Sequence, residues 1–481
     1  MKKQVFNPYL PLNEYVPDGE PYVFDGRVYI YGSHDEARGE VYCPGNYVTW
    51  SAPVDDLTNW RYEGEIYRRT QDPSNAEDKM QLWAPDVAKG TDGRYYLYYC
   101  FSFYPEIGVA VSDSPAGPFA FYGHVHYPEQ RNNGAVLREY LPFDPGVLVD
   151  DDGRVYLYYG FAPAETNPDF PIIPSPGSMV VELEADMVTV KEGPKLCVPG
   201  AAHSEGTGFE GHAFYEASSM RKIGETYYFI YSSELSHELC YATSRRPDGG
   251  FVYGGTIISN GDIGLNGRER SVNMTGNNHG SMVEINGEWY VFYHRQTHAT
   301  EASRQGCAEK IQIQEDGSIR QAEITSCGLN GGPLTGKGTY PAAIACHLTG
   351  KIDLGKIVYG QNRKEVLPYI YEEENGDSLI ANITDGVVFG YKYFALENLS
   401  QVKVEVRGNA EGTLWMFLEN PMDFSEAEFN EKAAGKAQLS IHSDAWMPVA
   451  IATEQVTDGI HPVYFLYAGK GSCSVRTIEL L

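Results

Sequence analysis

The sequence has no long apolar run, and this absence limits where the protein can act. Nowhere do roughly 18 apolar residues follow one another, so no segment is long enough for a transmembrane helix. Lys2 and Lys3 are followed by no apolar stretch of the kind found in an export signal. We therefore expect no membrane partner and a cytoplasmic location.

Cysteine is sparse as well. Eight cysteines are spread over a chain of 481 residues, and no two of them form a Cys-x-x-Cys pair. This pattern is unlike the disulfide framework of a small secreted protein and unlike a zinc site. We expect reduced thiols.

Positive charge is also scarce. Lys and Arg total 37 against 65 Asp and Glu, which gives a net charge of −28. Such a chain repels nucleic acid and anionic membrane surfaces. We therefore expect no nucleic-acid partner.

Tyrosine and glycine, in contrast, are abundant. The chain has 36 Tyr and 51 Gly, and 42% of its residues are apolar. This composition excludes a disordered chain and favours strands and turns over long helices, so we predict an all-β fold. The length exceeds that of one ordinary core and suggests two domains.

One hairpin pattern occurs five times. Each copy has a turn followed by a strand of aromatic and β-branched residues, and in four copies the turn is Asp-Gly or Asn-Gly, which suits a two-residue hairpin. The turn glycines are Gly26, Gly93, Gly153, Gly224 and Gly287, with spacings of 60 to 71 residues. A unit of this length holds about four short strands, which predicts a five-bladed β-propeller. Unrelated hairpins in a large sandwich are the alternative, but sandwich strands seldom recur so regularly.

A polar or ionisable residue stands seven to nine positions before each of these glycines. The five residues are Asp18, Asp86, Asp144, Glu216 and His279. If each hairpin joins the innermost strand of a blade to the next strand, these side chains face the central axis. Carboxylates crowded around one axis repel one another, and their pKa values separate, as general acid and general base catalysis require.

Several motifs resemble those of glycoside hydrolase family 43. They are Pro17-Asp18, Trp83-Ala84-Pro85-Asp86-Val87, Asp144-Pro145, Glu216 before Tyr227-Tyr228, His279-Gly280-Ser281 and Tyr293-His294-Arg295. The resemblance covers about residues 8 to 325. It implies a five-bladed propeller that hydrolyses β-xylosides and α-L-arabinofuranosides with inversion, and it implies no cofactor for the chemistry.

The resemblance also implies roles for three carboxylates. Asp18 corresponds to the general base, Glu216 to the general acid, and Asp144 to the carboxylate that raises the pKa of the acid and positions it. Inversion requires an acid and a base roughly 6.5–9.5 Å apart, so that a water molecule fits between them. Glu210 competes for the acid role and Glu20 for the base role, but the repeat offset favours Glu216.

Four further residues follow from the same resemblance. His279 corresponds to an axial histidine near a structural calcium ion, Arg295 to a substrate-contacting arginine, and Trp83 to the wall of the sugar pocket. A buried core histidine, a surface ion pair and a packed core tryptophan are the competing interpretations. Asp86 is interpreted as structural.

The repeat ends near Cys327. We predict a propeller over residues 1–327, a linker over 328–336, and a jelly-roll-like β-sandwich over 337–481. Parts of this last region resemble family 6 carbohydrate-binding modules. Trp446 could stack on a sugar ring, or the domain could brace the propeller.

The predicted function is an inverting exo-glycosidase. It would remove arabinofuranose or xylose from hemicellulose-derived oligosaccharides, with the long insertions 127–141 and 162–177 closing one end of the channel. An endo-acting arabinanase, a non-catalytic sugar-binding propeller and a retaining fructan-type enzyme are the alternatives. A protein-interaction propeller is disfavoured because the Trp-Asp signature of such repeats is missing.

Overall fold

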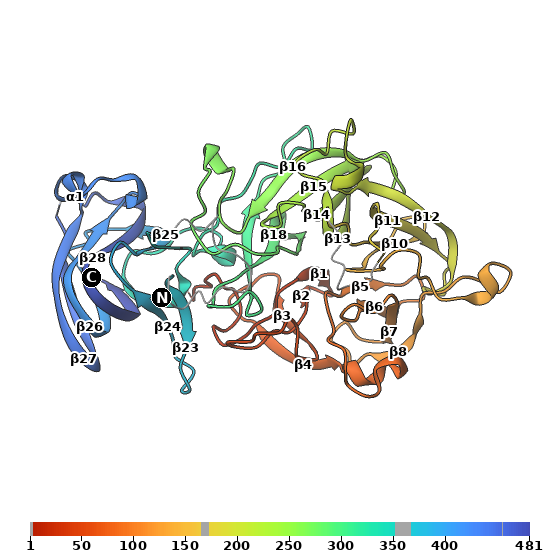
Figure 1. Cartoon of the computed structure of the whole chain (residues 1–481), viewed down its shortest axis with the longest axis horizontal. Helices are drawn as coiled ribbons and strands as arrows, with labels where there is room; N and C mark the ends of the chain where they lie inside the picture. The colour runs from red at the N-terminus through yellow and green to blue at the C-terminus, as the bar shows by residue number, and fades with distance from the viewer. Residues whose placement is uncertain (1–2, 165–172, 352–366, 455) are drawn as a thin grey trace.

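The computed structural model describes residues 3–164, 173–351, 367–454 and 456–481, and strands are the predominant regular structure in them. Five small sheets surround a common axis, so the predicted five-bladed propeller is confirmed (Figure 1). The first blade contains β1 (Glu20–Phe24), β2 (Arg27–Tyr31), β3 (Tyr47–Pro53) and β4 (Arg61–Tyr67). The second contains β5 (Asp86–Lys89), β6 (Tyr95–Cys100), β7 (Ile107–Ser112) and β8 (Ala120–His124).

The other three blades follow in sequence order. The third contains β9 (Gly146–Val149), β10 (Val155–Tyr159), β11 (Gly177–Leu183) and β12 (Val190–Pro199). The fourth contains β13 (Phe214–Ile223), β14 (Thr226–Ser233), β15 (Glu238–Ser244) and β16 (Val252–Ser259). The fifth contains β17 (Ser281–Ile285), β18 (Glu288–Arg295) and β19 (Gln305–Ile311).

Each repeated hairpin joins the innermost strand of a blade to the next strand, as the repeat predicted. Asp25 and Gly26 connect β1 to β2 with φ angles of 49° and 75°. Asn286 and Gly287 connect β17 to β18 with φ angles of 51° and 81°. Positive φ at both central positions gives a turn whose twist matches that of the flanking strands, which is why Asp-Gly and Asn-Gly occur there.

The two ends of the propeller sequence close the ring. Gly19, next to β1, forms a parallel bridge with Gly280, next to β17. The backbone N–H of Asn7 donates to Ser326 O at 3.0 Å, and its side-chain amide donates to Ala308 O at 2.9 Å. The N-terminal segment therefore lies beside the last blade and protects the edge of a sheet that has only three named strands.

The remaining strands form a second, sheet-rich domain, on the left in Figure 1. Its elements are β20 (Leu334–Thr335), β21 (Gly338–Pro341), β22 (His347–Thr349), β23 (Tyr369–Glu372), β24 (Ser378–Ile383), β25 (Val388–Leu396), β26 (Gln401–Phe417), α1 (Glu426–Lys432), β27 (Gly435–Ala452) and β28 (Gly459–Leu480). Within the predicted linker, β20 already pairs with β25. Arg407 and Arg476 both lie over the ring of Trp446, so this ring is engaged inside the domain.

Short 3₁₀ helices occur between the strands of both domains. They are η1 (Arg69–Gln71), η2 (Pro73–Asn75), η3 (Asn132–Gly134), η4 (Ala201–His203), η5 (Leu265–Gly267), η6 (Gly328–Asn330), η7 (Ala342–Ile344) and η10 (Pro421–Asp423). Among the described residues, no helix combines the length and apolarity that crossing a membrane requires.

The two domains are joined by polar contacts, one of them buried and another near the surface. Lys392 of β25 is 3% exposed, and its ammonium group lies 2.9 Å from a carboxylate oxygen of Asp262 and 2.9 Å from one of Glu323. Near the N-terminus, the side-chain oxygen of Gln4 accepts from Thr335 N at 2.7 Å. These contacts join the second domain to the propeller at the segments that follow β16 and β19 and at the N-terminal segment.

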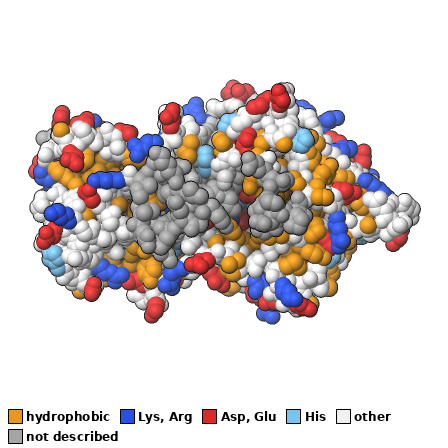
Figure 2. Space-filling model, in the orientation of Figure 1, with side chains coloured by type: hydrophobic (Ala, Val, Ile, Leu, Met, Phe, Trp, Pro, Cys, Tyr) orange, Lys and Arg blue, Asp and Glu red, His pale blue; other side chains and the backbone are white. Residues whose placement is uncertain are grey.

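The surface and the thiols agree with the composition. On the face shown in Figure 2, Lys and Arg side chains are scattered among Asp and Glu rather than gathered into one patch. All eight cysteines lie in described residues, are buried, and form no disulfide. Part of the predicted insertion 162–177, namely residues 165–172, lies outside the described residues.

Candidate active site

The innermost strands bring the predicted residues to one place in the fold. Asp18, Asp144 and His279 each stand two residues before an innermost strand, namely β1, β9 and β17, and Glu216 lies near the start of β13. These strands neighbour one another around the axis. Polar side chains at equivalent places therefore converge on one end of the propeller channel, as the repeat offsets predicted.

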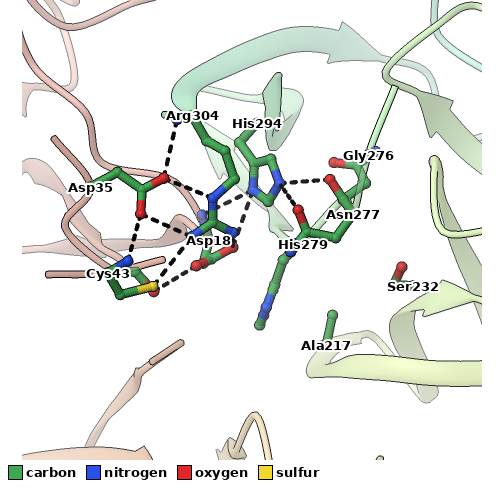
Figure 3. A network of polar contacts seen from close by, with 12 residues as sticks. Asp18, Asp35, Cys43, Ala217, Ser232, Gly276, Asn277, His279, His294 and Arg304 are labelled. Carbon is green, nitrogen blue, oxygen red and sulfur yellow. Dashed lines mark hydrogen bonds and ion pairs between the residues drawn. The ribbon is translucent and has the colours of Figure 1, made fainter. Parts of the chain in front are cut away.

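Asp18 is buried and strongly paired. Arg304 Nη1 donates to Asp18 Oδ1 at 3.0 Å, and Ser33 Oγ donates to Oδ2 at 2.5 Å. The backbone N–H of Asp18 donates to His294 Nδ1 at 3.2 Å, and His294 Nε2 lies 2.7 Å from Asn277 O (Figure 3). Burial opposes ionisation, but the Arg304 guanidinium and His294 outweigh it and lower the pKa of Asp18 well below its usual range. Asp18 is therefore ionised.

The pKa values of Glu216 and Asp144 are raised, in contrast to that of Asp18. Burial and the negative charge of Asp18 raise the pKa of Glu216 to about 7. Burial, Glu216 and Asp18 raise the pKa of Asp144 well above its ordinary value. Asp144 Oδ2 accepts from Ala217 N at 3.1 Å, so it also holds the backbone beside Glu216. One carboxylate is kept ionised while its neighbours retain protons near neutral pH.

His279 lies in the channel between the carboxyl groups of Asp144 and Glu20. Its Nδ1 lies 3.5 Å from Asp144 Oδ2 and its Nε2 lies 3.9 Å from Glu20 Oε1. Burial lowers the pKa of His279 to about 4, so its ring is neutral near pH 7 and a ring nitrogen can face a cation or a water molecule.

The surroundings of His279 suit a cation that keeps most of its water ligands better than a cation bound only by protein oxygen atoms. Calcium takes six to eight oxygen ligands. Among the described residues, Glu20 Oε1 is a buried carboxylate oxygen without a hydrogen-bond partner. Burial and the charge of Asp86 raise the pKa of Glu20 to about 8, so this part of the channel is short of positive charge. His279 and Glu20 would hold such an ion, whose charge would favour the ionised carboxylates.

A second ring of polar groups lies next to His279 in the channel. Arg221 Nη2 donates to Glu20 Oε2 at 2.7 Å, and Ser219 Oγ donates to the same oxygen at 3.1 Å. Asp86 accepts from Tyr22 Oη at 2.7 Å and from the backbone N–H of Val147 at 2.7 Å. The carboxylate of Asp86 thus joins three blades, which agrees with its interpretation as structural.

The other predicted residues fall in different places. Trp83 packs edge-on against Phe143, the residue before Asp144, with ring centroids 5.2 Å apart, so it lies beside the carboxylates. Arg295 does not join them. Because side chains alternate along β18, His294 faces Asp18, whereas Arg295 points to the second domain and donates to Ala345 O at 3.0 Å. Glu210 is exposed and accepts from Gly206 N in a turn.

Two residues of the site were missed by the sequence reasoning. Arg304 lies directly before β19, and Asp35 follows β2. Arg304 Nε donates to Asp35 Oδ2 at 2.8 Å while its Nη1 reaches Asp18, so one guanidinium joins two carboxylates (Figure 3). The repeat offsets examined only the residues before each innermost strand. A buried arginine before an outer strand gives no comparable periodic signal.

Comparison with known proteins agrees with this geometry. The family described as "Glycosyl hydrolases family 43" matches residues 12–319. The chain belongs to glycosyl hydrolases family 43. Membership confirms the family and the enzyme class that the motifs predicted, and this family 43 chain is a glycoside hydrolase.

Relatives of this family 43 chain include two curated proteins. One, "Xylosidase/arabinosidase" of Thermoclostridium stercorarium, is 48% identical over 488 residues, which cover 100% of this chain and 99% of that protein. "Beta-xylosidase" of Xylanibacter ruminicola is 32% identical over 316 residues, covering 59% of this chain and 88% of that protein.

A solved structure is similar to the propeller. It is a family 43 β-xylosidase/α-arabinofuranosidase from a compost microbial metagenome, in complex with xylotriose and in a calcium-free form. Its sequence is 28% identical, with a TM-score of 0.51, and the match covers 67% of this chain and 98% of the other. The resemblance of the second domain to family 6 carbohydrate-binding modules stays a prediction.

Proposed function

We propose that this chain is an inverting exo-glycosidase that removes α-L-arabinofuranosyl or β-D-xylosyl units from xylan- or arabinan-derived oligosaccharides. The observation that carries the proposal is the separation of protonation states at the mouth of the channel. Arg304 keeps Asp18 ionised, while burial and the charge of Asp18 keep a proton on Glu216 up to about pH 7. The names of the two curated relatives support the choice of sugars.

In the proposed mechanism the two carboxyl groups act on opposite faces of the sugar. Glu216 donates its proton to the glycosidic oxygen as the bond to the anomeric carbon breaks. Asp18 accepts a proton from a water molecule, whose oxygen attacks the anomeric carbon from the other side. The anomeric configuration is inverted, and no covalent intermediate with the protein forms. Each group uses the protonation state that its surroundings impose, and the chemistry needs no cofactor.

Asp144 and Trp83 have supporting roles in this proposal. Asp144 fixes the backbone beside Glu216 through Ala217 N, and its negative charge, when present, favours the protonated acid. Trp83 and Phe143 place apolar surface next to these carboxyl groups, which suits one face of a sugar ring.

A panel of nitrophenyl glycosides tests the substrate class. We expect turnover of the α-L-arabinofuranoside or the β-D-xyloside and not of a β-D-galactoside. Proton NMR of the first-formed sugar should show the anomer opposite to that of the substrate. A retained configuration would overturn the inverting mechanism, and release of internal fragments from linear arabinan would favour the endo-acting alternative.

Calcium near His279 is a prediction with its own test. His279 and Glu20 would hold the ion, and its positive charge would lower the pKa of Glu20, which burial raises to about 8. Exhaustive dialysis against EDTA, followed by metal analysis and thermal unfolding with and without added Ca²⁺, would test it. We expect Ca²⁺ to raise the unfolding temperature of the wild type and to have no such effect on His279→Ala. Equal responses of both proteins would contradict the site.

A further inference from the structure

A partly enclosed cavity separates the fifth blade from the second domain. The empty space within it, together with the solvent at its open side, is about 460 Å³. The propeller side is formed by residues 273–274 and 295–299, and the other side by Ala345, Leu348 and residues 367–370. Because Arg295 and His294 alternate along β18, this cavity lies on the face of the strand opposite the catalytic carboxylates.

Arg295 enters this cavity, and none of the described residues forms an ion pair with it. Its side chain is 3% exposed, and Nη2 donates to Ala345 O at 3.0 Å. Within the described part of the chain, Nε and Nη1 have no hydrogen-bond partner. Glu309 acts on Arg295 electrostatically, but this carboxyl group is bound to Asn7 and Thr325. A buried guanidinium in this state is costly unless something else supplies negative charge.

Lys392, at the same interface, is a buried cation that does have counter-ions. Its ammonium group is buried to a similar degree, and it lies 2.9 Å from Asp262 and 2.9 Å from Glu323. The chain has 65 acidic residues, so pairing Arg295 would not have required an unusual sequence. The contrast between Lys392 and Arg295 indicates that the counter-ion of Arg295 comes from outside the described protein.

The lining limits what this counter-ion can be. Arg295 supplies one positive charge, and burial lowers the pKa of His298 to about 3, so this second basic lining residue is neutral. The single positive charge of Arg295 is balanced by a ligand with a single negative charge. Apolar side chains that include Leu348, Pro368 and Ile370 form much of the remaining wall, which suits a small hydrocarbon group rather than a strongly hydrated ion.

We propose that this interdomain cavity binds a small organic monocarboxylate. The carboxylate accepts hydrogen bonds from Nε or Nη1 of Arg295, and its hydrocarbon part lies against Leu348 and Ile370. Such a charge-assisted hydrogen bond is stronger than a neutral one, and it satisfies nitrogen atoms that otherwise stay unpaired. Bound between the domains, the ligand stabilises their contact.

Thermal unfolding and calorimetric titration of the full chain test this site. Acetate and butyrate are compared with chloride and phosphate at equal ionic strength. We expect the carboxylates to raise the unfolding temperature saturably, by roughly 2–4 °C at high excess, with the larger effect for butyrate. Chloride or phosphate shifts as large as those of acetate would overturn the carboxylate assignment, and so would no shift with either carboxylate.

Three variants separate the site from a general salt effect. Arg295→Met should reduce carboxylate affinity at least tenfold. Arg407→Met, which removes a guanidinium paired with Glu373 elsewhere in the second domain, should keep the wild-type response. If Arg295→Met does not fold, Ala299→Leu narrows the cavity while retaining the charge and should also weaken binding. An unchanged response in the folded Arg295→Met or Ala299→Leu protein would overturn the proposal.

Discussion

The propeller channel contains two neighbouring groups of buried carboxylates that differ in how positive charge is shared. In the catalytic ring, formed by Asp18, Asp144 and Glu216, Arg304 makes an ion pair with Asp18 and acts on the other two only from a distance. In the second ring, formed by Glu20 and Asp86, Arg221 makes an ion pair with Glu20 and its charge also acts on Asp86, although burial still raises the pKa of both.

This difference shows how carboxylates can have two functions in one channel, proton transfer in one ring and stabilisation in the other. Unequal sharing separates protonation states, which is useful for proton transfer to and from a substrate. Sharing around Arg221, with Ser219, Tyr22 and Val147 N as further donors, ties blades together instead. We therefore expect changes in the catalytic ring to alter rate and its pH dependence, and changes in the second ring to alter stability.

The largest effect is expected for Glu216→Gln. The variant cannot donate a proton, so kcat for a substrate with a poor leaving group should fall by about 10²–10⁴. Dinitrophenolate is a good leaving group that departs without protonation, so kcat of the variant on a dinitrophenyl glycoside should be nearly normal. Steady-state kinetics on both substrates measure the difference. Glu210→Gln removes an exposed carboxylate six residues earlier and should keep wild-type kcat on both.

If Glu216→Gln were equally slow on both substrates, the residue would not be the general acid. The same pair of substrates distinguishes Asp18, since Asp18→Asn should be slow on both because the water still needs a base.

Arg304→Met should shift the whole pH profile. The guanidinium lowers the pKa of Asp18 and, more weakly, that of Glu216, so its removal raises both. The acid limb of kcat/KM reflects Asp18 and should move to higher pH by about one to three pH units, and the alkaline limb should follow. In the wild type the alkaline limb is expected near pH 7, because Glu216 must be protonated to act.

Arg295→Met is the matched control, because it removes a buried guanidinium on the opposite face of β18. Its limbs should coincide with those of the wild type. An Arg304→Met profile that kept its wild-type limbs would show that Arg304 does not set the protonation of Asp18.

Glu20→Gln should affect stability rather than rate. Burial raises the pKa of Glu20 from 4.5 to about 8, so between these values the native state binds more protons than the unfolded state. Stability therefore falls as pH rises from about 4.5 to about 8. The glutamine side chain of the variant cannot ionise, so Arg221 loses its ion pair with Glu20 and keeps only the more distant charge of Asp86. Thermal unfolding at pH 6 and pH 9 should show a fall that is smaller than in the wild type by roughly 2–4 °C.

The kcat of Glu20→Gln at its pH optimum should stay within about twofold of the wild type. A loss as large as that of a catalytic carboxyl group would instead favour Glu20 as the general base, the competitor that the sequence left open.

The smallest effect is expected for Ser219→Ala. The variant loses the hydrogen bond from Ser219 Oγ to Glu20 Oε2, and the free energy of unfolding should fall by about 0.5–1.5 kcal/mol. Denaturant titration measures this change. An effect on kcat without an effect on stability would break the division between the two rings.

Much of the fold could be predicted from the sequence because the propeller repeats one local signal. Turns such as Asn286-Gly287 require positive φ, and their spacing gave the blade number and the innermost strands. The same register located Asp18, Asp144 and Glu216.

Contacts between distant segments were harder to predict. Arg304 reaches Asp18 across 286 positions of sequence, and nothing local marks it as a partner. The motif Tyr293-His294-Arg295 suggested that Arg295 contacts the substrate. In the structure His294 contacts Asp18 instead, because neighbouring residues of a strand point to opposite faces of the sheet, and Arg295 therefore points away from the site.

The fastening of the ring has a consequence for how the protein is made. Asn7 binds Ala308 and Thr325, which are synthesised 301 and 318 positions later. Until the ribosome has delivered the fifth blade, Asn7 lacks these partners and the growing chain presents an open sheet edge. Strands of neighbouring nascent chains can pair with such an edge, so slow translation near residues 305–326 would favour aggregation over closure.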